Sequence, residues 1–278
     1  LGRNDADFFE SCLKAMGEDV KLFDTFIYHG YAPAPESSYA QVELQKAVLA
    51  KYNPKARMWQ GENGCPSEMA RRFALNSISW SENSQAKWDM RRMLGDLGHD
   101  VLSSVFTICD FNHTGREINL KGLIRANEEK EVIAIKKAYY AVQNVVSVFD
   151  DTLVRVKDSS FAEGFGTKDA SISAYHYVKD GRLPLFVFWT HGRDFAKKEG
   201  KWSFPFERPG DSFETRPAVF KYTGAALEEP VWVDLFTGRV YEFPKAKQLV
   251  ARKSVRFIDV PVYDSPCVLT EKTALPLQ

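Results

Sequence analysis

The chain has 278 residues, 44% of them hydrophobic and 27% charged, which is the composition of a soluble globular protein large enough to bury a core. Lys and Arg number 37 and Asp and Glu also number 37, so no basic surplus indicates a nucleic-acid partner. No apolar run is long enough to cross a bilayer. The four cysteines are widely spaced and lack a C-x-x-C pair, so neither a disulfide framework nor a zinc site is expected.

The first half of the chain alternates amphipathic helices with short apolar strands. Apolar side chains at helical spacing predict helices over residues 5–17, 36–52, 82–98 and 129–149. Runs of strand-forming residues predict strands over residues 23–28, 57–61 and 102–109. Strand–helix alternation with short connections indicates a parallel α/β fold. A closed barrel needs eight strands, and only about three are evident before the pattern changes.

After residue 150 the pattern becomes all-β. Short apolar runs separated by turn residues predict strands over residues 153–157, 171–177, 185–189, 218–222, 231–235, 240–243, 255–258 and 267–270. Residues 191–216 are polar and rich in Gly and Pro, which predicts a long loop. We therefore expect two domains, residues 1–150 and residues 151–278, the second a β-sandwich.

Each of the three strands expected in the first half is followed by polar side chains. These positions are of interest because barrel active sites lie at the carboxyl ends of strands. The first strand is followed by His29 and Tyr31, which suit hydrogen bonding to sugar hydroxyls or to a carboxylate; the alternative is structural packing. The second ends at Glu62 before Asn-Gly, where the alternative is a capping or salt-bridged Glu. The third ends at Asp110, where the alternative is a turn or cap residue.

Several other kinds of site have no support in the sequence. It contains no G-x-S-x-G, no P-loop and no dinucleotide-binding glycine pattern. The remaining histidines are isolated, without the spacing of metal ligands. We therefore expect neither a cofactor nor a metal ion.

Taken together, these segments resemble the C-terminal half of a retaining (β/α)8-barrel glycoside hydrolase of the clan A type, with a trailing β-sandwich domain. Residues 24–31 resemble the sixth barrel strand, residues 59–64 the seventh and residues 105–110 the eighth, and residues 81–92 resemble the helix after the seventh strand. Residues 121–124 and 137–144 resemble the stretch that leads out of the barrel. The implied fold is α/β plus all-β: about strands six to eight of a TIM barrel, then a β-sandwich.

The resemblance also implies roles for particular residues. Glu62 takes the position of the nucleophile, which attacks the anomeric carbon in a double displacement. His29 and Tyr31 would line the sugar subsite nearest the cleaved bond, Trp59 and Asn63 are weaker lining candidates, and Asp110 would hold a sugar hydroxyl. The implied substrate is an oligo- or polysaccharide, and such enzymes are commonly secreted or periplasmic.

The general acid/base does not follow this pattern. In the clan it is a Glu, usually after an Asn, that ends the fourth strand, but only 22 residues precede Phe23 and they contain no Asn-Glu pair. Asn127-Glu128 follows the eighth strand and is rejected. Either the chain is a fragment of a full enzyme, or it is a non-catalytic carbohydrate-binding or scaffold protein. A half barrel would also leave a sheet edge open to self-association. A third hypothesis is an α/β fold unrelated to sugars, with a β-sandwich partner. A structure in which Glu62 is buried away from any cleft would support it.

Overall fold

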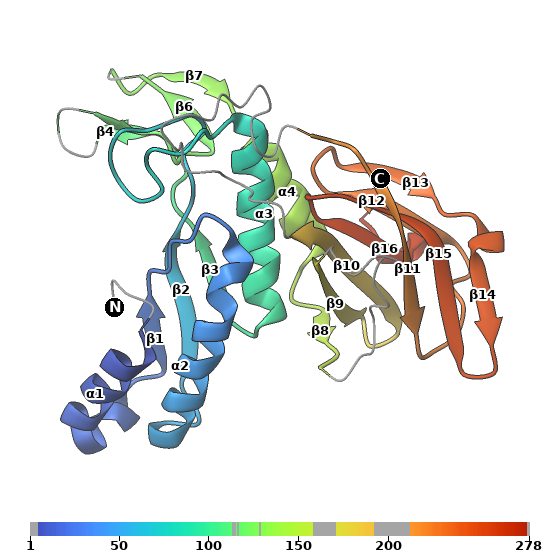
Figure 1. Ribbon diagram of the computed structural model, residues 1–278, viewed down its shortest axis with the longest axis horizontal. Helices are drawn as coiled ribbons and strands as arrows, with labels where there is room; N and C mark the ends of the chain where they lie inside the picture. Colours follow the sequence, from blue (N-terminus) through green and yellow to red (C-terminus); the bar gives the residue numbers. More distant parts are fainter. Residues whose placement is uncertain are drawn as a thin grey trace.

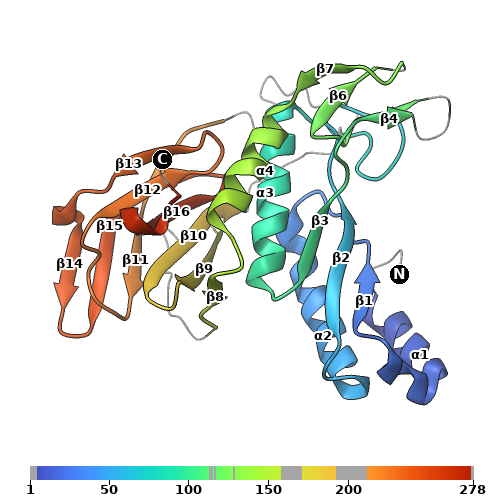
Figure 2. The same cartoon turned by 180° about the vertical axis from the view of Figure 1, so that it is seen from behind.

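A computed structural model describes residues 5–112, 115, 117–127, 129–157, 171–191 and 212–276. It is a mixed α/β structure in which helices α3 (Glu82–Gly98) and α4 (Lys137–Val148) lie between a three-stranded parallel sheet and a six-stranded antiparallel sheet (Figures 1 and 2). A three-stranded antiparallel sheet packs on the far side of the six-stranded sheet. Within these ranges no helix is both long enough and apolar enough to cross a bilayer.

Local sequence signals explain where the first helices begin and end. The Asp5 carboxylate accepts hydrogen bonds from two backbone amides of the first turn of α1 (Ala6–Met16), which ends at Gly17 with a φ of 58°. Ser81 and Ser84 form a reciprocal capping box at the start of α3. The other elements before α4 are η1 (Gly17–Leu22), β1 (Thr25–Tyr28), η2 (Pro35–Ser38), α2 (Tyr39–Tyr52), β2 (Arg57–Asn63), β3 (Leu102–Val105), β4 (Phe111–Asn112), β5 (Ile118–Asn119), β6 (Ile124–Ala126) and β7 (Val132–Ile135).

The parallel sheet has the strand order β1-β2-β3 and differs sharply between its two faces. On one face Tyr28 and Met58 are buried in a core shared with α1 and α2. On the other face Ile27, Trp59 and Leu102 stand side by side in register and are 45%, 37% and 44% exposed. Parallel sheets are normally covered on both faces, so this row, which we call the open face, is unusual.

The helix expected over residues 129–149 is partly wrong. Residues 132–135 instead form β7, which pairs antiparallel with β6, and α4 begins only at Lys137. The run Val-Ile-Ala-Ile is rich in β-branched side chains, which favour an extended backbone when a partner strand is available. The predicted helix begins too early because the apolar spacing of the following helix was extended too far upstream.

The third strand is shorter than the expected range of residues 102–109. β3 ends at Val105, after which the Phe106 amide donates to the Asn63 carbonyl at 2.5 Å. Cys109 then forms an isolated parallel bridge with Ile124. Asp110 therefore lies beyond the parallel sheet and does not end one of its strands.

The second half is all-β in its described part, as the sequence predicts, apart from short 3₁₀ turns. The six-stranded sheet has the order β13-β12-β16-β10-β9-β8, and the smaller sheet has the order β11-β15-β14. The expected loop at residues 191–216 lies mostly outside the described residues. The elements are β8 (Leu153–Arg155), β9 (Ser171–Lys179), β10 (Leu183–His191), β11 (Arg216–Tyr222), β12 (Pro230–Asp234), β13 (Arg239–Glu242), η3 (Lys245–Lys247), β14 (Gln248–Ala251), β15 (Ser254–Val262), β16 (Cys267–Glu271) and η4 (Lys272–Ala274).

Strand β10 is buried on both faces and joins two apolar cores. Phe186 and Phe188 face the smaller antiparallel sheet. Val187 and Trp189 face α3 and α4, in a core that also contains Met90. Because this second core includes residues from both halves of the chain, the helices and the six-stranded sheet support each other's folding.

Candidate functional site

A β-bulge determines how Glu62 is presented. Gln60 pairs with Ser103 of β3, but Asn63 pairs with Val105, so β2 has one more residue than its partner over this stretch. Asn63 is consequently buried, and its side-chain amide donates to the Ser103 hydroxyl at 3.2 Å. The Glu62 side chain remains 32% exposed. A Glu62 buried away from any cleft would support the third hypothesis, and the structure does not place Glu62 in this way.

Two side chains that follow β1 contact the Glu62 carboxylate. The Tyr31 hydroxyl donates to Oε1 of Glu62 at 2.8 Å. Nδ1 of His29 lies 3.2 Å from Oε2 of the same carboxylate. The carboxyl ends of β1 and β2 are adjacent in the sheet (Figure 1), so both contacts follow from parallel pairing of these strands. The structure thus brings together three residues that are predicted site residues in the sequence.

Gln60 links the Glu62 strand to the Tyr31 loop, and it was not among the predicted site residues. Its side chain is fully buried, accepts from the Glu62 backbone amide at 3.2 Å and donates to the Gly30 carbonyl at 3.2 Å. A polar residue two positions before a strand-end carboxylate is the only sequence signal that indicates this role. Gln60 fixes the spacing between the two strand ends.

The electrostatic surroundings of the carboxylate include a buried lysine that was also not predicted. Burial lowers the pKa of Lys121 to about 8, against the opposing effects of Cys65, Glu62 and Asp89. The Lys121 ammonium lies 5.7 Å from the centre of the Tyr31 ring. Burial, followed by the hydrogen bond to Glu62, raises the pKa of Tyr31 well above its ordinary value, so the hydroxyl keeps its proton and remains a donor.

Two glycines allow the strand ends to approach each other. A Cβ at Gly61 would overlap the Ile27 side chain, and a Cβ at Gly64 would overlap the Phe106 carbonyl oxygen. The first contact lies between β2 and β1, and the second lies just beyond the ends of β2 and β3, so the two are on either side of Glu62. Glycine at these positions is therefore a packing requirement of the site.

Side chains of α3 and β10 donate hydrogen bonds to the loop that carries Tyr31 and to the residues that follow it. Nε1 of Trp88 donates to the Ala32 and Pro33 carbonyls at 3.0 and 3.1 Å. A few residues further on, Oε1 of Glu36 accepts from Nε of Arg91 at 2.8 Å and from Nε1 of Trp189 at 2.6 Å. We call these last three residues the Glu36 junction.

Charge pairing stabilises the Glu36 junction. Burial pushes the pKa of Glu36 upward, but the Arg91 guanidinium outweighs this effect and holds the pKa below its ordinary value. Arg91 and Trp189 are almost fully buried. The junction therefore ties the Tyr31 loop to the antiparallel half of the molecule.

The other predicted binding residues lie in different surroundings. Trp59 is on the open face and donates through Nε1 to the Ser104 hydroxyl at 2.8 Å. Asp110 is buried, where it accepts from the Lys136 ammonium at 2.6 Å and from the Gly122 amide at 2.9 Å. Burial raises the pKa of Asp110 despite this lysine. These contacts fit the structural alternative for Asp110, and its role in sugar binding stays a prediction.

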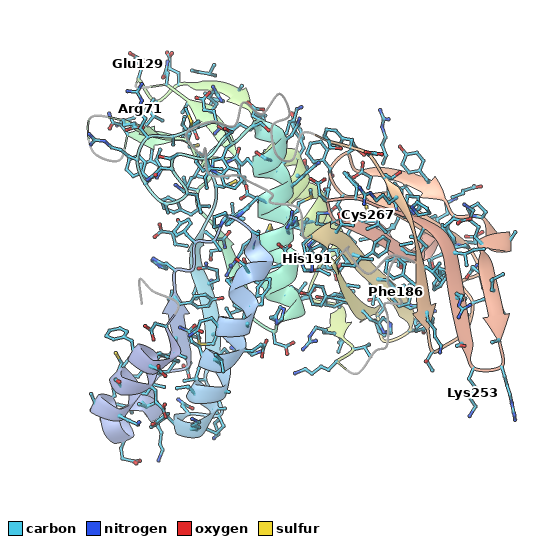
Figure 3. The ribbon with its side chains drawn as sticks, in the orientation of Figure 1. Arg71, Glu129, Phe186, His191, Lys253 and Cys267 are labelled. Carbon is cyan, nitrogen blue, oxygen red and sulfur yellow. The ribbon has the colours of Figure 1, made fainter. Side chains whose placement is uncertain are left out.

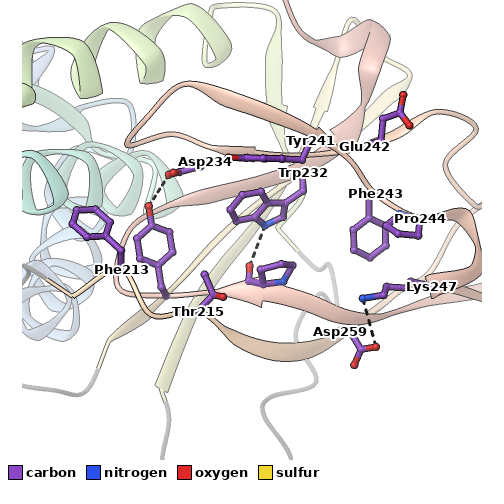
Figure 4. A pocket seen from close by; sticks show the side chains of 12 residues that line it. Phe213, Thr215, Trp232, Asp234, Tyr241, Glu242, Phe243, Pro244, Lys247 and Asp259 are labelled. Atoms are coloured by element: carbon purple, nitrogen blue, oxygen red, sulfur yellow. Dashed lines mark hydrogen bonds and ion pairs between the residues drawn. The ribbon is translucent and has the colours of Figure 1, made fainter.

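A separate groove of about 450 Å³ lies on the antiparallel half of the molecule (Figure 4). It is lined by aromatic and charged side chains from β12, β13, β15 and neighbouring segments. None of its lining residues belongs to the site around Glu62. Figure 3 shows the side chains of the described residues, with Phe186 and Cys267 marking the six-stranded sheet.

Comparison with known proteins identifies the fold. No protein-family model and no curated protein sequence matches the chain. The crystal structure of the GH51 arabinofuranosidase from Xanthomonas axonopodis pv. citri is similar, with a TM-score of 0.51 and 11% identity over 97% of this chain and 56% of that chain. That of a conserved exported protein from Bacteroides fragilis has a TM-score of 0.50 and 11% identity over 89% of this chain and 46% of that chain.

The chain spans about half the length of these two structures. At such low sequence identity, the structural similarity is informative on the fold alone. The chain therefore has a glycosidase-like fold, which is the coarser part of what its sequence predicts.

Proposed function

We propose that the chain carries the nucleophile of a retaining glycoside hydrolase that acts on an oligo- or polysaccharide. The observation that supports this most is the partly exposed Glu62 carboxylate, held by Tyr31 at one oxygen and by His29 at the other, at the ends of two adjacent parallel strands. A carboxylate fixed in this way can approach an anomeric carbon in one orientation.

The reaction would run in two displacements. A Glu62 oxygen forms a bond to the anomeric carbon while the glycosidic C–O bond breaks, and the leaving oxygen takes its electron pair and a proton from a general acid. Water, deprotonated by the same group, then attacks the anomeric carbon and releases the Glu62 carboxylate. Tyr31 and His29 would hold the carboxylate throughout, and Trp59 would contribute an apolar surface nearby. No cofactor is needed for these steps.

The second carboxyl group would come from further polypeptide. Retention requires two carboxyl groups about 5–5.5 Å apart, whereas within the described residues the hydrogen bonds and ion pair of Glu62 go to Tyr31, His29 and Gln60. The exposed row of the open face supports the same proposal, because added strands would cover it. On this proposal residues 1–150 are part of a barrel, residues 151–278 are a β-sandwich domain, and the complete enzyme works outside the cytoplasm.

Covalent labelling tests Glu62 without requiring the general acid. We would incubate the chain with 2,4-dinitrophenyl 2-deoxy-2-fluoro glycosides of several sugars and search for labelled peptides by mass spectrometry. The dinitrophenolate leaves without protonation, and the fluorine slows hydrolysis of the glycosyl-enzyme bond, so the label would accumulate on the nucleophile. We expect one sugar of the panel to label Glu62 and the Glu62→Gln variant to remain unlabelled. Glu68→Gln, which alters an exposed carboxylate a little further along the chain, is the matched control.

The competing function is carbohydrate binding without turnover. It is favoured by the same contacts of Glu62, which include no second carboxyl group among the described residues. In that case the fluorinated glycosides would bind reversibly, Tyr31→Phe would weaken binding, and no covalent label would form with any sugar. Mass spectrometry and a binding titration on the same sample separate the two functions.

A further inference from the structure

The groove on the antiparallel half has the size and chemistry of a small-molecule site. Its volume of about 450 Å³ lies within the range of about 300–1,000 Å³ that is usual for ligand pockets. It opens where the six-stranded sheet, through β12 and β13, meets β15 of the smaller sheet. This region is remote in the fold from the ends of β1 and β2 (Figure 1).

The groove presents aromatic rings to solvent. Tyr241 on the edge strand β13 is 46% exposed, and Phe213 is 44% exposed. Trp232 lies behind Tyr241 with ring centres 5.6 Å apart, and its Nε1 donates to the Pro261 carbonyl at 3.0 Å. The buried Trp232 therefore fixes the position of the exposed tyrosine ring (Figure 4). Rigid, partly exposed aromatic rings offer large contact areas at little cost in conformational entropy.

Other lining residues supply hydrogen-bonding groups of both signs. Asp259 and Lys247 form an ion pair at 3.6 Å, and their side chains are 60% and 37% exposed. Glu242 adds a second exposed carboxylate on β13. Exposed ion pairs contribute little to stability, so these groups can exchange their partners for those of a ligand.

The backbone around Asp259 contains a β-bulge. Ala218 pairs with Val260 and Phe220 with Phe257, so β15 carries an extra residue at this point. Asp259 occupies this bulge with a φ of 53°, a conformation uncommon for residues other than glycine. Bulges re-aim side chains, and this one brings a carboxylate to a groove that contains aromatic rings.

We propose that this groove is a second carbohydrate site, which binds a neutral oligosaccharide apart from the site around Glu62. The C–H faces of a pyranose or furanose ring pack on Tyr241 and Phe213, and its hydroxyl groups both donate to the carboxylates and accept from Lys247. A purely apolar ligand would strip the charged groups of water without replacing it. A phosphate-bearing ligand would meet three carboxylates, those of Asp234, Glu242 and Asp259, and one ammonium, which disfavours it.

The test is an array of neutral oligosaccharides of four to six units, covering β-glucans, xylans, arabinans and galactans, probed with the labelled chain. We expect the wild type to bind at least one of them, and the Glu62→Gln variant is included to show which of the two sites holds the sugar. Tyr241→Ala should weaken binding about tenfold through loss of the stacking surface. Asp259→Gly keeps a residue that tolerates the positive φ and should also weaken binding. Tyr140→Ala, at a tyrosine 51% exposed on α4, is the matched control.

Three outcomes would overturn the second site. They are no binding to any member of the array, equal binding by Tyr241→Ala and the wild type, or binding that is lost in Glu62→Gln but kept in Tyr241→Ala. The last outcome would place the sugar at Glu62 and so support the proposed function while removing the groove. Failure of Glu62 labelling, conversely, leaves the groove test unaffected, because the two sites share no residue.

Discussion

Tyr31 is the residue whose hydroxyl most directly restrains the Glu62 carboxylate. We expect Tyr31→Phe to slow covalent labelling of Glu62 about tenfold to a hundredfold, because small misplacements of a reacting group cost rate on this scale. Tyr52→Phe is a matched control, since the Tyr52 hydroxyl donates to a glutamate, Glu10, at 3.1 Å far from the site. Stopped-time mass spectrometry gives both rates. Equal rates for Tyr31→Phe and the wild type would show that the hydrogen bond does not position the nucleophile.

Lys121 makes stability depend on pH in a defined direction. Its pKa is lowered from 10.5 to about 8 on folding, so between these values the unfolded chain binds more protons than the folded one. The free energy of unfolding therefore rises with pH in this window as far as Lys121 contributes. We expect Lys121→Met to raise the stability relative to wild type most at pH 7 and progressively less toward pH 10. Urea unfolding at four pH values measures this, and a difference independent of pH would contradict it.

At the scale of elements, the Glu36 junction connects the β1 loop to α3 and β10. Glu36→Gln removes the charge that compensates the buried Arg91 guanidinium, and breaking such a pair costs about 3–5 kcal/mol. We expect the free energy of unfolding to fall by about this amount in urea titrations. Glu18→Gln breaks a surface pair with Lys21, whose side chains are 89% and 63% exposed, and should change stability by about 1 kcal/mol or less. Similar losses in both variants would rule out a special role for the junction.

The elements predictable from sequence are those with strong local signals. The spacing of apolar side chains predicts α1 and α3 within a residue or so of their bounds. The hairpin β6–β7 was not predictable, because pairing with a strand a few residues upstream decides the state of residues 132–135. Helical periodicity cannot detect such a partner.

The candidate site likewise contains residues that the sequence predicts and residues that it does not. His29, Tyr31 and Glu62 stand at strand ends, where position alone suggests chemistry. Gln60 and Lys121 were missed because their proximity to Glu62 arises from packing between segments. The bulge that separates the orientations of Glu62 and Asn63 depends on the register between β2 and β3. That register is a property of the sheet and not of either strand.

At the scale of the whole molecule, the open face of the parallel sheet predicts association. Ile27, Trp59 and Leu102 form an exposed apolar row, and β1 is an edge strand of this sheet among the described residues. Such surfaces are usually covered. We expect the isolated chain to self-associate with increasing concentration, and Leu102→Glu to shift it toward monomer, in sedimentation-velocity runs. Leu249→Glu, on a β14 residue 48% exposed, should leave the distribution unchanged. A wild-type monomer at every concentration would refute this expectation.

The arrangement of the molecule explains how a small parallel sheet can present a defined carboxylate. The six-stranded sheet packs on α3 and α4 in a shared core, and Trp88 of α3 donates a hydrogen bond to the loop after β1. Tyr31 of that loop then donates a hydrogen bond to Glu62. The antiparallel half thus contributes to the site without touching the carboxylate. The groove at its far edge offers a second place where a sugar could bind.

The identity of the labelled residue after treatment with dinitrophenyl 2-fluoroglycosides tests the central claim most directly. If Glu62 is a glycosidase nucleophile, tandem mass spectrometry will locate a single glycosyl ester on Glu62, and the label will be absent from Glu62→Gln but present in Glu68→Gln. A glycosyl ester on another carboxylate, or no ester with any sugar of the panel, would contradict the assignment.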